Sequence, residues 1–148
     1  MDLDTIQIVL GAWKSMESRA DAIGQHLYVR LSATDPALVA ILGGADMQAN
    51  QHSLMLVLGR LIAALDDPEA LVSMTGALGR RYAAYRIQPR HLDHFREALS
   101  EAIALELGAD FTIERRRAWT EVSTLIISLL LRAMRHDVPA LLRTNTHV

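Results

Sequence analysis

Apolar residues recur along almost the whole chain with the spacing of an α-helix, and nowhere with the strict alternation of a β-strand. The longest stripe combines Met47, Leu54, Leu58, Leu61 and Leu65, at spacings of seven, four, three and four residues. Residues at these spacings lie on one face of a helix. The sequence therefore predicts an all-α fold.

Proline, glycine and aspartate interrupt this pattern and divide it into about seven helices of unequal length. Asp35 and either Asp66 or Asp67 precede prolines, which is typical of helix starts, because the carboxylate accepts backbone N–H bonds and proline fits the first helical position. Gly108 is typical of a helix end. We expect helices over residues 4–19, 21–33, 36–42, the stripe up to 65, 68–85, 89–107 and from Thr112 towards Pro139.

Several of these helices carry aromatic residues on their expected inward faces, among them Trp119 on the last helix. The periodicity of the first predicts burial of Ile6, Leu10 and Trp13. On the fifth it turns Tyr82 into the core, where a polar hydroxyl requires an explanation. The full inward set expected of the fifth helix is Leu71, Met74 or Thr75, Leu78, Tyr82 and Tyr85.

The size and charge of the chain favour one folded domain with no polyanionic partner. The chain has 148 residues, of which 51% are hydrophobic and 22% charged, and its formal charge is −2. These values are typical of a globular domain and give no nucleic-acid footprint. The run Arg115 to Arg117 is interpreted as a solvated helix start.

The composition also bears on the compartment. The chain has no cysteine, which excludes disulfides and thiolate metal sites and suits a reducing compartment. Acidic residues stand near the N-terminus where a secretory signal needs positive charge. The most apolar run, "LIISLLL", is too short to span a bilayer. We therefore expect a cytoplasmic protein that does not enter a membrane.

Four stretches, taken in order, resemble the bacterial globins of the flavohaemoglobin and single-domain type. They are "HLYVRLSATDPALVAIL", "QHSLMLVLGRLIAALDDPEAL", "LGRRYAAYRIQPRHLDHF" and "ELGADFTIERRRAWTEV". The resemblance covers about residues 5–135 and leaves 136–148 as a tail. It implies a single globin-like domain over residues 1–148, a 3-over-3 helical sandwich, and a pocket for haem.

The resemblance also implies an iron ligand, and here the chain departs from the family. The family carries its ligand histidine five residues before the aliphatic residue of the following turn. Counting back from Ile87 reaches Tyr82, and no histidine lies between His52 and His91. A tyrosine therefore stands where the metal ligand is expected.

Other pocket positions carry over with varying agreement. Tyr28 matches the distal tyrosine of the family, Asn50 its distal amide or imidazole, and Gly24 a glycine where two helices approach closely. Leu42 replaces a phenylalanine that packs on the haem, and Leu92 replaces a tyrosine beside the ligand histidine. Helix positions then predict one cavity lined by Tyr28, Asn50, Leu54, Leu78 and Tyr82.

Two interpretations of Tyr82 remain open at this point. In the first, its phenolate binds ferric haem iron, and Arg86 or Arg81 supplies a nearby cation that favours ionisation. In the second, Tyr82 is a core tyrosine whose hydroxyl meets a carbonyl or water in a pocket that no longer binds iron.

The histidines give a weaker signal. His91 and His94 have the i, i+3 spacing that can chelate a metal, but without a third ligand we interpret them as a solvated helix start. His52 is expected to face solvent or the pocket rim. The sequence has no Ser-His-Asp order, phosphate loop or carboxylate pair typical of an enzyme, so no residue is assigned to catalysis.

Two hypotheses of function follow. The first is a haem protein with an anionic ligand, used in redox or gas sensing or in haem handling and not in reversible oxygen carriage. The second is a haem-free globin-fold sensor or interaction domain that holds an apolar ligand. The second hypothesis would suit a homodimer formed through the first, sixth or last helix.

Overall fold

The computed structural model describes residues 1–42 and 47–136, and almost all of them are helical. The expected Met47 start of the long apolar stripe falls at the edge of this range. The elements are α1 (Leu3–Met16), η1 (Glu17–Arg19), α2 (Ala20–Thr34), α3 (Pro36–Leu42), α4 (Met47–Ala63), α5 (Pro68–Ala84), α6 (Pro89–Leu107), η2 (Gly108–Asp110) and α7 (Ile113–His136).

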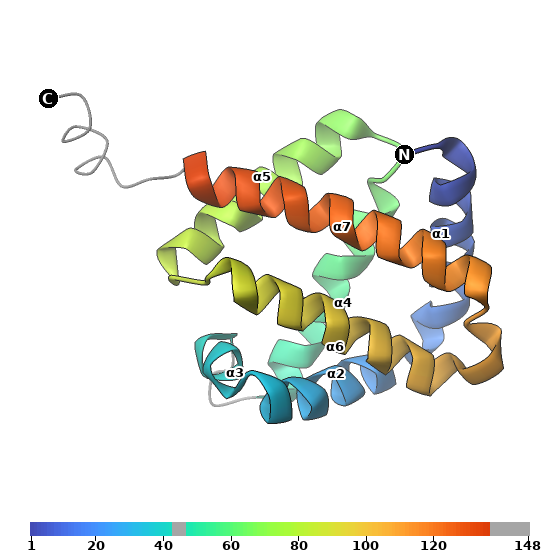
Figure 1. Ribbon diagram of the computed structural model, residues 1–148, viewed down its shortest axis with the longest axis horizontal. Coiled ribbons are helices and arrows are strands. Elements are labelled where there is room, and N and C mark those ends of the chain that lie inside the picture. Colours follow the sequence, from blue (N-terminus) through green and yellow to red (C-terminus); the bar gives the residue numbers. More distant parts are fainter. Residues whose placement is uncertain (43–46, 137–148) are drawn as a thin grey trace, which may run out of the picture.

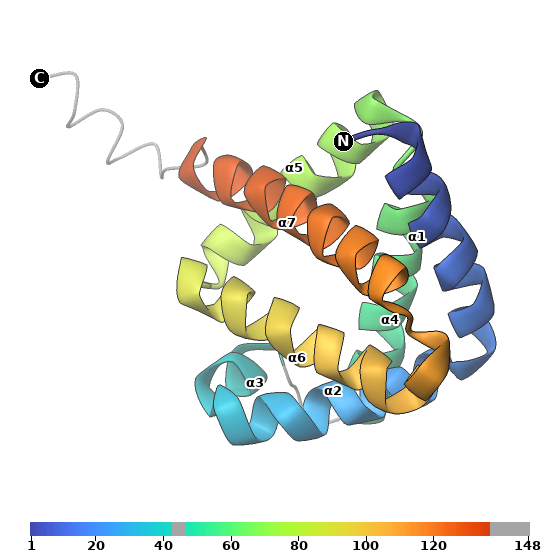
Figure 2. The same cartoon turned by 45° about the vertical axis from the view of Figure 1, so that its right-hand side comes forward.

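The long helices form two layers of three. Helices α1, α4 and α5 contact one another in sequence order, and α6 packs against both α2 and α7 in the other layer. The layers are joined where α5 and α1 cross α7 and where α2 crosses α4. Figures 1 and 2 show α2 along the lower edge, α6 above it, and α7 on the far side of α6 from α2. The all-α, two-layer prediction is confirmed.

Local capping explains where the helices begin. The Asp2 carboxylate accepts the Thr5 N–H at 2.8 Å at the start of α1, and Asp67 accepts the Ala70 N–H at 3.2 Å at the start of α5. Asp67 is thus the cap, with Pro68 in the first turn. Gly108 follows the last residue of α6 as its C-cap. It has φ 55°, a conformation that glycine adopts without strain.

The end of α5 matters most for the site. The Arg86 N–H donates to the Ala83 carbonyl and the Ile87 N–H to the Tyr82 carbonyl, both at 3.0 Å. Arg86 itself has φ 61°. This pattern is a Schellman motif, which reverses the chain directly after the helix. It turns Ile87 back towards Tyr82.

The structure corrects the expected inward faces in two places. The predicted first helix breaks at Met16 into the short η1 turn, and its buried face contains Val9 and Met16, whereas Ile6 and Leu10 are only half-buried. Several apolar neighbours made the phase of this helix ambiguous. Tyr85 is 53% exposed, because it is the C-cap of α5 and lies where the helix no longer packs on the core.

Two glycines allow helices to cross closely. A Cβ on Gly24 of α2 would lie 3.1 Å from the Met55 Cγ of α4, which confirms the close approach expected there. A Cβ on Gly79 of α5 would lie 2.9 Å from the Leu130 carbonyl oxygen of α7. Both crossings therefore depend on the missing side chain.

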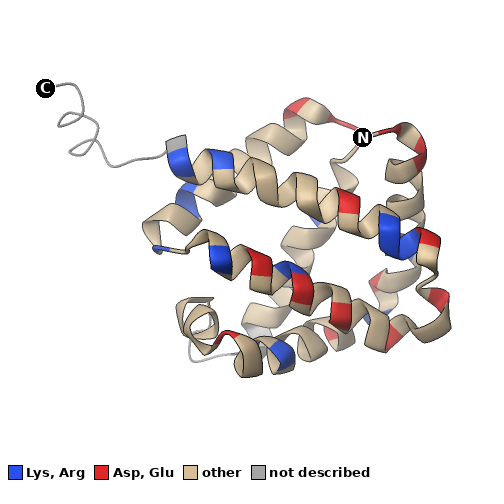
Figure 3. Ribbon diagram, in the orientation of Figure 1, with Lys and Arg blue, Asp and Glu red and all other residues tan. Residues whose placement is uncertain are grey.

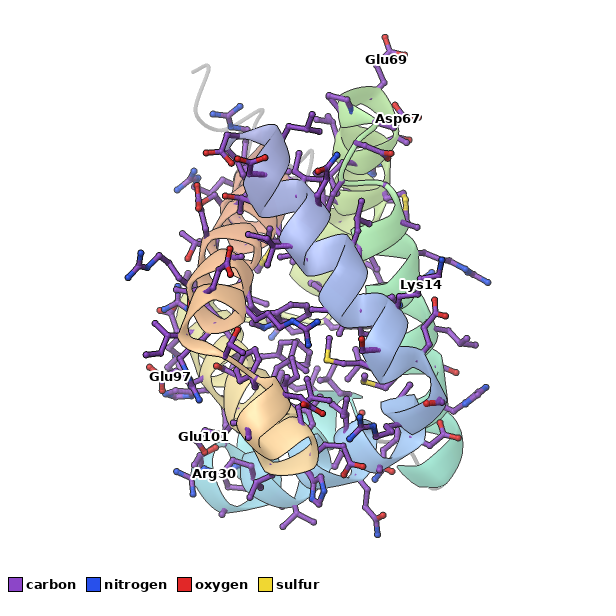
Figure 4. All side chains as sticks on the ribbon, turned by 90° about the vertical axis from the view of Figure 1, so that its right-hand side faces the viewer. Lys14, Arg30, Asp67, Glu69, Glu97 and Glu101 are labelled. Atoms are coloured by element: carbon purple, nitrogen blue, oxygen red, sulfur yellow. The ribbon has the colours of Figure 1, made fainter. Side chains whose placement is uncertain are left out.

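An ion pair joins two neighbouring helices of one layer at the surface. The Arg30 guanidinium of α2 pairs with the Glu101 carboxylate of α6, and Figure 4 shows these two side chains at neighbouring positions. Both are about half exposed, so such a pair contributes little to stability. On the face seen in Figure 3, α6 and α7 each carry residues of both charge signs. None of the described helices is long and apolar enough to cross a membrane.

Candidate functional site

Side chains from α3, α4, α5, α6 and α7 surround one apolar cavity between the two layers. The free volume of this cavity is about 80 Å³, which is below the ~300–1,000 Å³ of typical ligand pockets. Its polar lining is confined to a few groups. The lining residues are Leu38, Leu42, Leu54, Val57, Leu58, Leu61, Ile62, Leu78, Tyr82, Ile87, Leu92, Phe95, Arg96, Leu99, Trp119, Val122, Ser123, Ile126, Ile127 and Leu130.

The structure brings together four of the residues expected at the site. Leu42 of α3, Leu54 of α4, and Leu78 and Tyr82 of α5 all line the cavity. They come from three helices that are separated along the chain. The apolar stripes indicated Leu54, Leu78 and Tyr82, whereas Leu42 was implied by the family resemblance. Tyr82 is therefore part of the cavity wall.

The other three expected residues lie elsewhere. Tyr28 is buried in α2 with 2% of its surface exposed, and Asn50 is half-buried in α4, but neither is among the residues that line the cavity. Arg86 is exposed on the Schellman turn. Its left-handed backbone conformation accounts for this, because the turn directs the chain away from the axis of α5.

Tyr82 is half-buried in the cavity wall, and its hydroxyl forms no hydrogen bond with the described residues. Burial raises the pKa of Tyr82 above its ordinary value, the Arg81 guanidinium opposes the increase, and the nearby Tyr28 adds to it. The cation that acts on the phenol is thus Arg81. Without a metal, Tyr82 is neutral at pH 7.

Tyr28 is close enough to Tyr82 for an ionised phenolate on either ring to disfavour ionisation of the other. Burial likewise raises the pKa of Tyr28. Tyr28 therefore stays a neutral hydroxyl, which can donate or accept a hydrogen bond.

Trp119 supplies a polar group that the sequence analysis missed. Its ring lines the cavity, and its buried Nε1–H has no hydrogen-bond partner among the described residues. A buried donor without a partner costs free energy, so it favours an acceptor brought by a ligand. The sequence indicated only that Trp119 is buried, because periodicity gives the face of a residue and not the partner of its nitrogen.

Arg96 is a second missed residue. It lines the cavity from α6, and its guanidinium donates to the Thr124 hydroxyl at 3.3 Å and lies 3.8 Å from the Asp93 carboxylate. Arg96 therefore places a positive charge at the edge of an otherwise apolar space. Its position four residues after Leu92 is the one signal in the sequence that could have indicated it.

The histidine expectations are partly wrong. His52 faces solvent and pairs with Asp21 at 3.0 Å, as expected. His91, by contrast, is 3% exposed, because its Nδ1 lies 2.7 Å from a carboxylate oxygen of Asp35. The interpretation of a solvated helix start is therefore wrong for His91. Asp35 is far away in sequence, and only the fold brings it close.

An all-helical, two-layer domain with an apolar cavity between its layers defines the globin class. The globin family model matches residues 33–130, and the chain belongs to the globin family. Neuroglobin of Tetraodon nigroviridis is 23% identical over 139 residues, covering 85% of this chain and 87% of that protein. Human hemoglobin subunit zeta is 24% identical over 137 residues, covering 86% and 94%.

A solved structure agrees in fold at lower sequence identity. A hexacoordinated heme protein from an anhydrobiotic tardigrade, determined at pH 4, superimposes with a TM-score of 0.81 at 11% identity. The match covers 91% of this chain and 96% of that structure. The 3-over-3 globin fold is therefore established across nearly the whole chain.

Proposed function

We propose that this chain is a globin that binds haem in the cavity between α5 and the opposite layer, with Tyr82 as the protein ligand of ferric iron. The observation that carries the proposal is the position of Tyr82. It lies in the cavity wall at the end of α5, directly before the turn that brings Ile87 into the same wall. The family membership and the heme named for the structural relative support it.

The chemistry of the cavity fits haem, although its present volume does not admit one. The wall is largely aliphatic and aromatic, with the Tyr82 hydroxyl, the Trp119 Nε1–H and the Arg96 guanidinium as polar groups. These offer an anionic oxygen ligand, a donor and a positive charge that suits a propionate. By the family resemblance Leu42 and Leu92 replace larger aromatic side chains, and aliphatic chains of this kind can change rotamer when a planar ligand enters.

The residues of this chain determine what such a haem would do. A bound haem would supply a redox-active iron centre. Tyr82 would hold it as an anionic oxygen donor, which stabilises Fe(III) over Fe(II). Because burial raises the pKa of Tyr82, the phenol loses its proton only when it binds the iron. This preference favours redox or gas sensing or haem handling, and disfavours reversible oxygen carriage.

Tyr28 is the group that we propose on the distal side, together with Asn50. Both are polar side chains on otherwise apolar helix faces, as the family resemblance implies. Neither lines the cavity in its present form, so their contact with a ligand requires the cavity to enlarge towards α2. We further propose a cytoplasmic location and the bacterial single-domain subgroup, both from the sequence.

A haemin titration of the purified protein tests the assignment of Tyr82. Wild type should give a saturable ferric high-spin spectrum with a phenolate-to-iron charge-transfer band. Tyr82→Phe should lose this band, and Tyr82→His should give a spectrum typical of histidine-ligated globins. Tyr85→Phe is the matched control, because Tyr85 is exposed three residues further along the same chain segment, and it should behave as wild type.

Two outcomes would reject the proposal in different ways. Identical specific spectra from wild type and Tyr82→Phe would show that Tyr82 is not the ligand. A specific spectrum from none of the variants, with unchanged far-ultraviolet circular dichroism, would favour the second candidate, a haem-free globin-fold sensor. The small volume and mainly aliphatic wall of the cavity are the observations that favour this candidate.

A further inference from the structure

A second cluster of ligand-type side chains lies outside the haem cavity, where the corner between α2 and α3 meets the start of α6. Asp35, His91 and His94 each offer one ligand atom, and these atoms lie within 4.8 Å of one another. The two imidazoles are one helical turn apart on α6, so they face the same direction. The carboxylate comes from a residue 56 positions before His91.

Both imidazoles converge on a single oxygen of the carboxylate. The Nδ1 atoms of His91 and His94 lie 2.7 and 2.8 Å from Asp35 Oδ2. The other oxygen, Oδ1, accepts the Leu38 N–H at 3.0 Å and caps α3. The Leu38 N–H thus holds the Asp35 carboxylate in place through Oδ1, while Oδ2 lies between the Nδ1 atoms of His91 and His94.

The burial of the three side chains and the access of solvent to them are also typical of a metal site. The side chains of His91 and Asp35 are 4% and 6% exposed, whereas that of His94 is 40% exposed. Two ligands are therefore fixed by packing, and the third lies on the side open to solvent. Solvent can reach the cluster there, which provides an entry path and a water for a further coordination position.

We propose that Asp35, His91 and His94 bind a divalent transition-metal ion, with Zn²⁺ as the representative ion. Two imidazole nitrogens and one carboxylate oxygen, with a position left for water, are a ligand set typical of zinc. The ion would take the place of the hydrogen bonds between the two Nδ1 atoms and Oδ2, with each imidazole binding it through a deprotonated Nδ1 and carrying its proton on Nε2. This proposal is independent of haem, because none of the three residues lines the haem cavity.

The required rearrangement is small. Tetrahedral zinc with bonds of about 2.1 Å separates its ligand atoms by about 3.4 Å, compared with the 2.7 and 2.8 Å between nitrogen and oxygen here. Each nitrogen–oxygen separation must open by well under one ångström, and the two imidazole nitrogens, which lie within 4.8 Å of each other, must settle at about 3.4 Å. His94 can supply most of this movement because it is half-exposed. Asp35 need not move, and its bond to the Leu38 N–H is kept.

The site would link two segments that also shape the cavity. Leu38 follows Asp35 in α3, Leu92 follows His91 in α6, and both leucines line the cavity. A metal bound here therefore ties α3 to the start of α6 at the edge of the haem pocket. Its direct consequence is a more stable attachment of α3, since an ion that binds only the folded state stabilises that state.

Zinc binding is measured on the full chain without an affinity tag, by isothermal titration and by thermal unfolding with and without added ZnCl₂. Wild type should bind one Zn²⁺ per chain and unfold at a higher temperature in its presence. His94→Gln should weaken binding by at least ~10-fold, since even a residue that only supports a ligand contributes ~10–100-fold to metal affinity. Because the His94 side chain is half-exposed, this substitution should leave the protein folded.

The matched control is His52→Gln. His52 pairs with Asp21 at 3.0 Å, a similar two-residue geometry, on the exposed surface, and no third ligand from the described residues joins them. Its removal should leave affinity and stoichiometry unchanged. Replacement of Zn²⁺ by Co²⁺ gives a second readout, because visible d–d bands report coordination by protein nitrogen and disappear in His94→Gln.

Three results would overturn the proposal. They are the absence of saturable Zn²⁺ binding to wild type, equal affinity in wild type and His94→Gln, and a loss of binding in His52→Gln that matches the loss in His94→Gln. In each case the three side chains form a hydrogen-bonded network only. A heat effect without a Co²⁺ spectrum would count against the proposal in the same way.

Discussion

Asp35 connects three helices of this protein, α2, α3 and α6. It ends α2, caps α3 through the Leu38 N–H, and accepts bonds from two histidines of α6. Burial by itself would raise the pKa of Asp35. The hydrogen bonds from His91, His94 and the Leu38 N–H, together with the charge on His91, outweigh this effect and lower the pKa to about 2.

This depressed pKa predicts an acid-dependent loss of stability. The unfolded chain, with the ordinary aspartate value of 3.8, binds more protons than the folded chain between pH 4 and 2. The contribution of Asp35 is therefore complete above about pH 4 and is lost as the pH falls towards 2, by roughly 2 kcal/mol in total.

Urea unfolding of wild type and Asp35→Asn at a series of pH values checks this expectation. The stability difference between the two proteins should be largest at pH 5 and should narrow towards pH 2. A difference that stays constant over the same range would show that the carboxylate contributes by packing and capping alone.

Tyr28 gives a second prediction at the residue scale, conditional on ligand binding. If the cavity enlarges towards α2, the buried hydroxyl of Tyr28 can form one hydrogen bond to the ligand. Tyr28→Phe should therefore weaken haemin binding by roughly 1 kcal/mol, the typical net value of one buried hydrogen bond. Competitive haemin titration measures the change, and an unaltered affinity would show that the ligand contacts are apolar or lie elsewhere.

At the scale of elements, the crossing of α5 over α7 sets the position of Tyr82. Gly79 lies at this crossing, and Tyr82 follows one turn later on the same helix. Any side chain at position 79 would meet backbone atoms of α7. A helix backbone cannot move aside by changing rotamer, as a side chain can. The crossing therefore fixes both the spacing of the two helices and the end of α5 that carries Tyr82.

Gly79→Ala should destabilise the protein by about 1–3 kcal/mol, because the added Cβ would lie 2.9 Å from the Leu130 carbonyl oxygen. Gly76→Ala, one turn earlier, is the control. Its Cβ would meet only the Arg80 guanidinium, at 3.4 Å, so alanine should be neutral or stabilising there. Chemical denaturation measures the free energy of unfolding of both variants. Equal changes in this free energy would show that Gly79 is not specifically required where α5 crosses α7.

At the scale of the whole molecule, ligand binding and folding are linked. The proposed pocket forms only when α3, α4, α5, α6 and α7 are in place, so haemin should bind the folded state alone. Free haemin at about 100 times its Kd should then stabilise wild type by ~2.7 kcal/mol. Tyr82→Phe should show a smaller increase in Tm at the same haemin concentration, whereas Tyr85→Phe should match wild type.

This comparison also separates ligation from filling of the pocket. If haemin raised the Tm of wild type and Tyr82→Phe equally, the pocket would bind the porphyrin without a bond from Tyr82 to the iron. If neither Tm changed, the haem-free candidate would be favoured.

The sequence by itself determined the helical class, most helix boundaries and the inward position of Tyr82. These properties are local, because capping residues, prolines and the 3.6-residue period act within one or two turns. For the same reason the sequence indicated that Leu54, Leu78 and Tyr82 share a cavity, but Tyr28 and Asn50, which were expected in the same cavity, are not among its lining residues. The errors on α1 and at Tyr85 arose where many apolar neighbours, or the end of a helix, made the phase ambiguous.

Only the tertiary structure decided which polar groups meet. Asp35 and His91 are 56 residues apart, and no periodicity relates them. The unpartnered Trp119 Nε1 and the positive charge of Arg96 at the cavity likewise depend on how α6 and α7 lie against the other layer. A hydrogen bond or a metal site requires distances within a few tenths of an ångström, and such distances result from the packing of whole helices.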